Sequence, residues 1–299
     1  MLKEAYLYQQ LENLAVRCQT CAHNCFLKIN QDGLCGVRKN IQGKLFVLNY
    51  GRAVAAAIDP IEKKPLYHFM PGTFTFSVAA AGCNFRCLNC QNWEISQVAK
   101  NKNLKKADIE KLGYDLPPEK IIEEAIKAQC PSISYTYSEP TVFLEWAFET
   151  MKIAKEKGLK NIWVSNGFMS QKTLNLILPY LDAANIDLKS FDDNFYRKVC
   201  GAQLEPVLKN LKFLKKAGIH LEITTLIIPS FSDNLKMIEK IACFIKSELG
   251  AETPWHLSRF FPDISFSLKN LPATPLETLK KAKQIGLKLG LKNIYLGNI

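Results

Sequence analysis

Three cysteines lie within eight residues, at Cys83, Cys87 and Cys90, with the spacing C-x3-C-x2-C. They follow an apolar run over residues 73–82 that predicts a buried strand. A cube of four irons and four sulfides is held by four thiolates, so a loop that supplies three leaves one iron open to a small molecule. Buried free thiols and a zinc knuckle are the alternatives, but the residues between the cysteines are too polar for a core segment. We interpret the loop as the ligand set of a 4Fe-4S cluster with one open iron.

A second group of cysteines lies near the N-terminus, at Cys18, Cys21, Cys25 and Cys35, in the arrangement C-x2-C-x3-C-x9-C. Four cysteines within eighteen residues are hard to explain by core packing, and this spacing could hold zinc or a second iron–sulfur cluster. Free thiols remain the alternative. The sequence predicts a metal site here and leaves the metal open.

The elements that must position these cysteines alternate between strand-like and helix-like segments. From Lys120 onward, short β-rich runs are separated by stretches whose apolar residues recur at helical spacing, which indicates βα units around a parallel sheet. We expect strands over residues 75–81, 132–136, 161–165, 184–188, 220–227, 254–259 and 293–296, and helices that include 118–128, 141–157 and 235–249. The predicted fold class is α/β, a partial (β/α)6 TIM-like barrel.

The chain divides into two regions of different character. Residues 1–72 carry the second cysteine group, are punctuated by glycine and resemble hairpins, with a probable strand over 44–50. We predict an N-terminal cysteine-bearing subdomain over 1–72 and the partial barrel over 73–299.

Polar residues stand near the ends of four predicted barrel strands: Glu139, Asn166, Lys189 and His256. Active sites of such barrels gather at the carboxyl ends of the strands, so these side chains could hold a ligand opposite the open iron. Taken singly, Glu139 could be a helix-start acid, Lys189 a surface charge and His256 a core histidine. Their repetition at successive strand ends favours a shared site.

Composition excludes several classes of protein. The chain has 299 residues, of which 47% are hydrophobic and 22% charged, as in ordinary globular proteins. No apolar run approaches eighteen residues and no secretory signal is visible, so we expect a cytoplasmic protein with reduced thiols and no membrane span. The net charge of +11 comes from lysines spread over many segments, which makes nucleic acid an unlikely partner.

Several motifs together resemble a known family. The sequence is similar to the AmmeMemoRadiSam system radical SAM enzymes, which are related to the pyruvate formate-lyase activating enzymes. The similar segments are residues 17–25, 57–69, 81–87, 90–97, 135–140, 165–168, 185–189 and 224–229. The resemblance implies a partial barrel of the radical SAM type with a 4Fe-4S cluster on Cys83, Cys87 and Cys90. It also implies that Glu139, Asn166, Lys189 and His256 hold S-adenosylmethionine (SAM).

The expected function is that of a radical SAM oxidoreductase. A one-electron reductant of the flavodoxin or ferredoxin type would reduce the cluster, and SAM would be cleaved to a 5′-deoxyadenosyl radical that takes hydrogen from an unidentified substrate. The substrate could be a protein or a small molecule, and a glycyl-radical-enzyme activating enzyme is one alternative. The alternative from another class is a zinc-containing nucleic-acid-binding protein, supported only by the cysteines and the charge.

Overall fold

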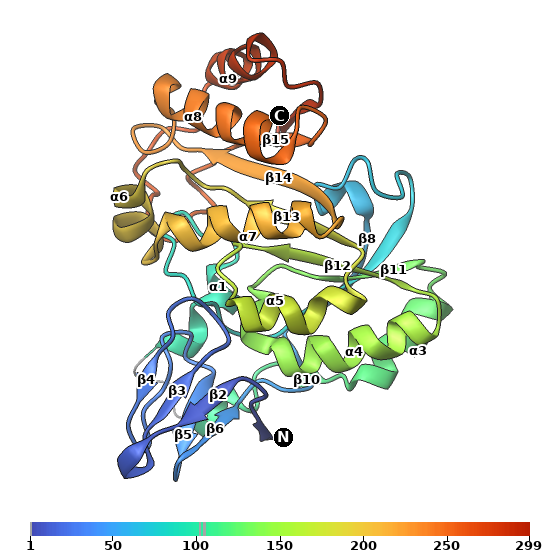
Figure 1. Ribbon diagram of the computed structural model, residues 1–299, viewed down its shortest axis with the longest axis vertical. Helices are drawn as coiled ribbons and strands as arrows, with labels where there is room; N and C mark the ends of the chain where they lie inside the picture. The colour runs from blue at the N-terminus through green and yellow to red at the C-terminus, as the bar shows by residue number, and fades with distance from the viewer. Residues whose placement is uncertain (1, 102, 104–105) are drawn as a thin grey trace.

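A computed structural model describes residues 2–101, 103 and 106–299. Its centre is an eight-stranded sheet in the order β16-β15-β14-β13-β12-β11-β9-β8 (Figure 1). The strands are β8 (Ala55–Pro60), β9 (Phe74–Ala79), β11 (Ser132–Tyr135), β12 (Lys160–Ser165), β13 (Ala183–Asp187), β14 (His220–Ile227), β15 (Trp255–Arg259) and β16 (Ile294–Gly297). All neighbours from β9 to β16 pair in parallel, and β8 pairs antiparallel with β9.

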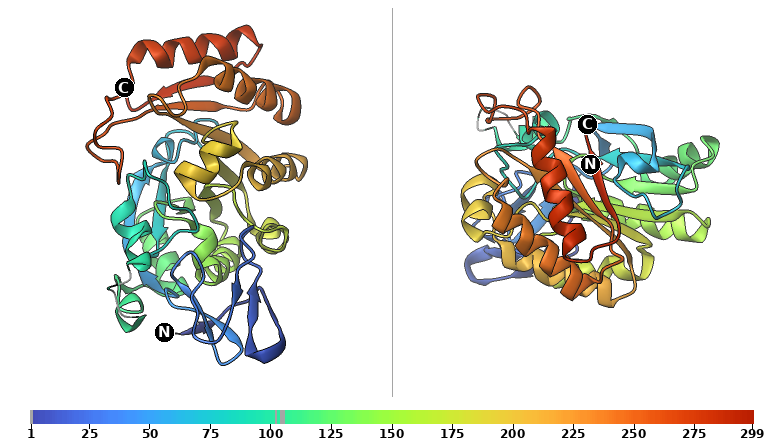
Figure 2. Two further views of the ribbon diagram at one scale, coloured as in Figure 1. Left: turned by 90° about the vertical axis from the view of Figure 1, so that its left-hand side faces the viewer. Right: turned by 90° about the horizontal axis from the view of Figure 1, so that it is seen from above.

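Helices lie between successive parallel strands and cover the outside of the curved sheet (Figures 1 and 2). They are α3 (Pro118–Lys127), α4 (Leu144–Glu156), α5 (Gln171–Ile177), α7 (Leu204–Lys216), α8 (Leu235–Phe244) and α9 (Leu276–Lys288). Strands covered on both faces must be apolar throughout, and β11 is buried at all four of its residues. The α/β class and the partial barrel predicted from the sequence are confirmed.

Predicted and observed elements differ at helix starts and ends. The helix expected over 141–157 begins as a 3₁₀ turn, Pro140–Phe143, before α4, and the helix expected over 235–249 ends in a π-helical segment, Ile245–Leu249. Shorter pieces are α1 (Trp93–Ser96), α2 (Lys106–Ile109), α6 (Asp193–Phe195), the π-helical Tyr196–Cys200, and the 3₁₀ turns Glu12–Leu14, Ile61–Lys63, Val98–Lys100 and Leu178–Tyr180. Among the described residues, no helix combines the length and apolarity that a membrane crossing requires.

The N-terminal region forms two small antiparallel sheets at one end of the molecule (Figure 1). One contains β2 (Tyr8–Gln10), β3 (Val16–Cys18) and β4 (Phe26–Leu27), and the other contains β1 (Lys3–Glu4), β6 (Lys44–Val47) and β5 (Arg38–Ile41). A separate two-stranded sheet joins β7 (Arg52–Ala53) to β10 (Tyr114–Asp115). The first two sheets share a core of Ala5, Val16, Cys18, Leu27, Leu45 and Val47.

The division at residue 72 stays a prediction. Strand β8 comes from the N-terminal side of that boundary, yet it extends the barrel sheet by pairing with β9. The run Ala55-Ala56-Ala57 has little strand propensity, so this edge strand depends on its partner rather than on its own sequence. A buried ion pair also joins the two regions, since Arg38 of β5 contacts Glu145 of α4.

Candidate active site

The loop that carries the three barrel cysteines, residues 83–90, is held at its start and by backbone hydrogen bonds from its interior. It begins after Gly82, whose φ of +107° is unfavourable for other residues, and a Cβ at this position would lie 2.8 Å from a methyl of Val37. The Arg86 and Leu88 amides donate to the carbonyls of Cys200 and Val199, at 2.7 and 3.0 Å. We call this segment the cysteine loop.

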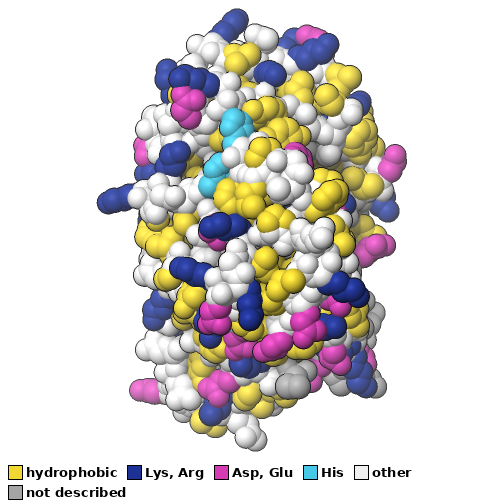
Figure 3. All heavy atoms as spheres, turned by 90° about the vertical axis from the view of Figure 1, so that its right-hand side faces the viewer, with side chains coloured by type: hydrophobic (Ala, Val, Ile, Leu, Met, Phe, Trp, Pro, Cys, Tyr) yellow, Lys and Arg dark blue, Asp and Glu magenta, His cyan; other side chains and the backbone are white. Residues whose placement is uncertain are grey.

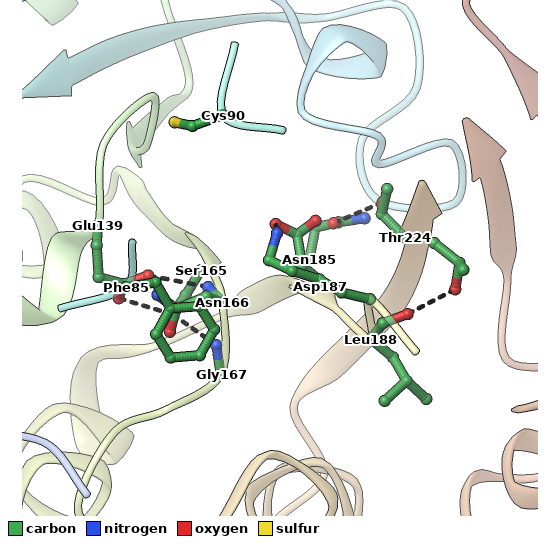
Figure 4. Close-up of polar contacts among 12 residues, drawn as sticks. Phe85, Cys90, Glu139, Ser165, Asn166, Gly167, Asn185, Asp187, Leu188 and Thr224 are labelled. Carbon is green, nitrogen blue, oxygen red and sulfur yellow. Dashed lines mark hydrogen bonds and ion pairs between the residues drawn. The ribbon is translucent and has the colours of Figure 1, made fainter. Parts of the chain in front are cut away.

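The cysteine loop forms one wall of a cavity of about 560 Å³. Cys83, Cys87 and Cys90 all line it, together with residues at or near the carboxyl ends of β11, β12, β13, β14 and β15. Figure 4 shows the side chains on neighbouring strand ends, with the Cys90 thiol across the opening from them. The expected gathering of polar groups at the strand ends is present for Glu139, Asn166 and Lys189, which all line this cavity.

Glu139 follows β11 and is held by four hydrogen bonds. Its Oε1 accepts from the Thr141 amide at 3.1 Å, the Thr141 hydroxyl at 2.5 Å and the Ser165 hydroxyl at 2.8 Å. Within the described part of the chain, its Oε2 accepts only from the Asn166 amide, at 2.9 Å, so this oxygen can take a further donor. Burial raises the pKa of the Glu139 carboxyl although the hydrogen bonds oppose the shift. A cationic ligand beside Oε2 would stabilise its ionised form.

Asn166 links the end of β12 to the cysteine loop. Its Nδ2 donates to Oδ1 of Asn84 at 2.7 Å and lies 3.9 Å from Sγ of Cys83. Its Oδ1 accepts from the Phe168 amide at 3.0 Å, which fixes the amide orientation. Asn166 therefore holds the first part of the cysteine loop in place as well as lining the cavity.

Lys189 supplies a positive charge just beyond β13. Its Nζ lies 2.7 Å from Oδ2 of Asp187, and its side chain is 16% exposed. Burial by itself would lower the pKa of Lys189, but the neighbouring Asp187 charge raises it well above its usual range. The side chain is therefore a firmly protonated cation beside Cys87 and the cavity.

His256 is the predicted site residue that does not line the cavity. It lies in β15, is 4% exposed, and its Nε2 is 2.6 Å from Oε2 of Glu222. Tyr67 and Tyr295 pack against the imidazole at 4.7 and 5.4 Å between ring centroids. Two residues further along β15, Ser258 reaches the cavity instead. A direct contact between His256 and SAM stays a prediction.

The cavity also has lining residues that were not assigned from the sequence. They include Lys63, Lys64, Asn185, Thr224, Ser258 and Asn298. Asn185 accepts a hydrogen bond from Thr224 at 2.8 Å, as Figure 4 shows, and donates to the Pro65 carbonyl at 2.8 Å. Period-two alternation identifies inward positions such as Thr224 and Ser258 once the strands are known.

The cysteine loop fits a cluster held by three thiolates. All three cysteines line one cavity, and Asn84 Nδ2 and Asn89 Oδ1 are buried within the loop without a hydrogen-bond partner among the described residues. Unpaired buried polar atoms are rare, so their presence here is consistent with a loop that folds around an additional polar group. In the described part of the chain, no three Cys, His, Asp or Glu side chains already surround a single metal position. Binding of a cluster would therefore require the thiol side chains to change rotamer.

The N-terminal cysteines do not reach this cavity. Cys18, Cys21, Cys25 and Cys35 line a separate space of about 10 Å³, to which Asn84 of the cysteine loop also contributes. All ten cysteines of the chain are free thiols.

Comparison with known proteins places these features in a family. The radical SAM superfamily matches residues 78–245, which include the whole cysteine loop and β11 to β14. An uncharacterised protein of Methanocaldococcus jannaschii is 46% identical over 100% of this chain and 86% of its own length. The pyruvate formate-lyase-activating enzyme of Clostridium pasteurianum is 22% identical over 68% of this chain and 86% of its own.

The fold has relatives among solved structures. A radical SAM methyltransferase from Sphaerobacter thermophilus superposes with a TM-score of 0.56 at 13% identity, covering 76% of this chain and 67% of that one. At this level of sequence identity, the similarity shows a shared fold alone.

Proposed function

This chain belongs to the radical SAM superfamily, and from that premise we propose that it cleaves SAM reductively at the cavity beside the cysteine loop. The observation that supports the proposal is the presence of three thiols and of Glu139, Asn166 and Lys189 around one cavity. When bound, a reduced 4Fe-4S cluster supplies the electron that breaks the bond between the sulfonium and the 5′-carbon, giving methionine and a radical that takes a hydrogen atom from the substrate.

The residues of the chain have separate roles in this proposal. Cys83, Cys87 and Cys90 would hold the 4Fe-4S cluster as three of the four ligands that such a cluster takes. Glu139 Oε2 accepts a hydrogen bond from the ammonium of SAM, and Lys189 pairs with an anionic group such as the carboxylate. Asn166 orients the cysteine loop through Asn84 while it contributes to the ligand pocket.

The finer assignments rest on the sequence motifs. We propose that the chain is an AmmeMemoRadiSam-type oxidoreductase and that a flavodoxin or ferredoxin supplies the electron. The substrate, a protein or a small molecule, is undefined.

Activation of a glycyl-radical enzyme is a second candidate, favoured by the similarity to an enzyme named for activating pyruvate formate-lyase. In that case the hydrogen donor would be a glycine Cα of a partner protein. A zinc-containing nucleic-acid-binding protein is not favoured. The cluster proposed here gives Cys83, Cys87 and Cys90 a role that needs no zinc, and Figure 3 shows basic side chains interspersed with acidic and apolar ones on one face.

The proposed chemistry is tested by the products of SAM. Reconstituted protein with a strong one-electron reductant should form 5′-deoxyadenosine and methionine, slowly without substrate and faster with it. Deuterium-labelled candidate substrates, proteins and small molecules alike, should transfer the label to 5′-deoxyadenosine. Methylthioadenosine as the sole product, or formation that does not depend on the reductant, would contradict the proposal.

Replacing Lys189 should weaken SAM binding without removing iron. Loss of one charged hydrogen bond costs about 1.5–3 kcal/mol, so Lys189→Met should raise the Kd for SAM by roughly tenfold or more. Equilibrium binding and an iron count would measure the two effects. Lys209→Met, which changes a side chain that is 69% exposed, is the matched control.

The same measurement of SAM affinity distinguishes the role of Lys189 from that of His256. Because His256 contacts Glu222 and does not line the cavity, His256→Ala should change SAM affinity less than Lys189→Met does. Wild-type affinity in Lys189→Met would remove this lysine from the site, and a larger loss in His256→Ala would show that the imidazole acts on the ligand.

A further inference from the structure

The fold brings the second cysteine group to one small cavity, although within the described residues its thiols are not already arranged around a single metal position. We call Cys18, Cys21, Cys25 and Cys35 the cysteine quartet. Cys18 ends β3, and its amide donates to the Cys25 carbonyl at 2.9 Å, which brings the two strands of the β3–β4 hairpin together. The loop before β5 supplies Cys35. All four residues line one cavity of about 10 Å³, although they are spread over eighteen positions of the sequence.

A buried cation with an unused donor lies beside the quartet. Arg38 lines the same cavity, is 2% exposed, and pairs with Glu145 through Nη1 and Nη2 at 3.0 and 2.6 Å. Its Nε is buried and has no hydrogen-bond partner among the residues that the structure describes. An unpaired buried N–H is costly, and a thiolate sulfur is an acceptor that would satisfy it. The orphaned donor independently indicates negative charge in this cavity.

The size of the cavity favours a single metal ion. A space of about 10 Å³ accommodates one centre, whereas the barrel cavity of about 560 Å³ has room for a cluster and a ligand together. Four cysteines around one ion are typical of structural zinc, which is tetrahedral and needs no open position. Four thiolates and Zn²⁺ carry a net charge of −2, which the adjacent guanidinium would offset in part. We propose that the cysteine quartet binds one structural Zn²⁺.

The quartet also holds the residues that shape the barrel cavity. Between Cys18 and Cys25, the Ala22 amide donates to the Phe168 carbonyl at 3.0 Å, and Nε2 of His23 is 2.9 Å from the Asn84 carbonyl. Cys21 itself forms an isolated β-bridge with Met169. The zinc therefore fixes a knuckle, residues 18–25, that braces the cysteine loop at Asn84 and the loop that follows Asn166. It positions the reactive site without contacting substrate.

Metal analysis of the untagged full-length chain tests the proposal. Purified without added iron or sulfide, the wild type and the Cys83→Ala/Cys87→Ala/Cys90→Ala variant should both contain about one zinc per chain. The Cys21→Ser/Cys25→Ser variant should lose at least about nine-tenths of it. Cys130→Ser alters a buried cysteine outside both groups and should leave the zinc unchanged. Because zinc is also counted in the variant that lacks the cluster ligands, that count does not depend on the SAM chemistry.

A conservative variant guards against misfolding of the double mutant. Zinc sites with three cysteines and one histidine are common, so Cys25→His should retain most of the zinc that Cys25→Ser loses. Replacing zinc with Co²⁺ should give the intense visible absorption of a tetrahedral thiolate site in the wild type and not in the double variant. Loss of zinc should also speed amide hydrogen exchange at residues 84 and 168–170, while residues 279–286 of α9 stay unchanged.

Several outcomes would overturn the proposal. A folded cluster-ligand variant without zinc would show that the quartet does not bind it. Iron with inorganic sulfide in that variant after reconstitution, in place of zinc, would identify a second cluster, and iron without sulfide would identify a mononuclear iron site. Equal zinc in Cys25→Ser and the wild type would place the metal elsewhere in the chain.

Discussion

Replacing Cys83, Cys87 and Cys90 together with alanine is expected to abolish 5′-deoxyadenosine formation. The reason is that no thiolates would remain on the cavity to hold the cluster, and SAM alone does not accept an electron at a useful rate. The variant should lack an electron paramagnetic resonance signal that shifts when SAM is added. Product should fall to the level of a reaction without protein.

Two control measurements test whether this loss of activity is specific to Cys83, Cys87 and Cys90. Cys130→Ala and Cys243→Ala remove cysteines outside both groups and should retain SAM cleavage. The zinc that we propose for the cysteine quartet should be present in equal amount in the triple variant and in the wild type, which would show that the chain still folds. A SAM-responsive signal that persists in the triple variant would mean that other residues hold the cluster.

Glu145→Gln is expected to cause the largest loss of stability among the changes considered. Glu145 is fully buried, accepts from both Arg38 and the Tyr6 amide, and connects α4 to the N-terminal sheets. Removing its charge deprives the buried Arg38 of its carboxylate partner, and breaking a buried ion pair in this way costs about 3–5 kcal/mol. Urea denaturation of the anaerobic protein should show a lower midpoint, with the N-terminal region losing structure first.

Two further variants test whether the stability loss in Glu145→Gln comes from an unpaired buried charge or from the loss of a contact alone. Glu205→Gln breaks the exposed Glu205–Lys209 pair and should cost less than about 1 kcal/mol. Arg38→Met/Glu145→Leu removes both buried charges, so it should recover much of the stability that Glu145→Gln loses. If the double variant were as unstable as the single one, the ion pair would not be the cause. Because Arg38 also borders the quartet, this series is measured with the zinc content recorded.

Much of the barrel could be predicted from local sequence. The strand predicted at 220–227 coincides with β14, and the other predicted strands differ from the observed ones by one or two residues at their ends. Strands buried on both faces and amphipathic helices have short-range periodicities that the chain carries regardless of its partners. The cysteine spacing is equally local, because a single loop holds Cys83, Cys87 and Cys90.

Other features depend on contacts that no local pattern encodes. β8 is a strand because β9 offers it an edge, and Arg38 meets Glu145 across 107 positions of sequence.

The two groups of site residues show where prediction from the sequence alone stops. The sequence by itself determined which side chains could do chemistry: the cysteines of both groups and the polar residues after the strands. Only the tertiary structure decided which of these side chains reach the cavity. The stagger of the parallel strands puts Ser258 at the cavity and His256 beside Glu222. It also decided that the knuckle of the cysteine quartet rests against Asn84 and Phe168. The position of each side chain relative to the cavity, and the contacts between distant segments, are set by the packing of whole helices and strands. Residue type and spacing do not specify that packing.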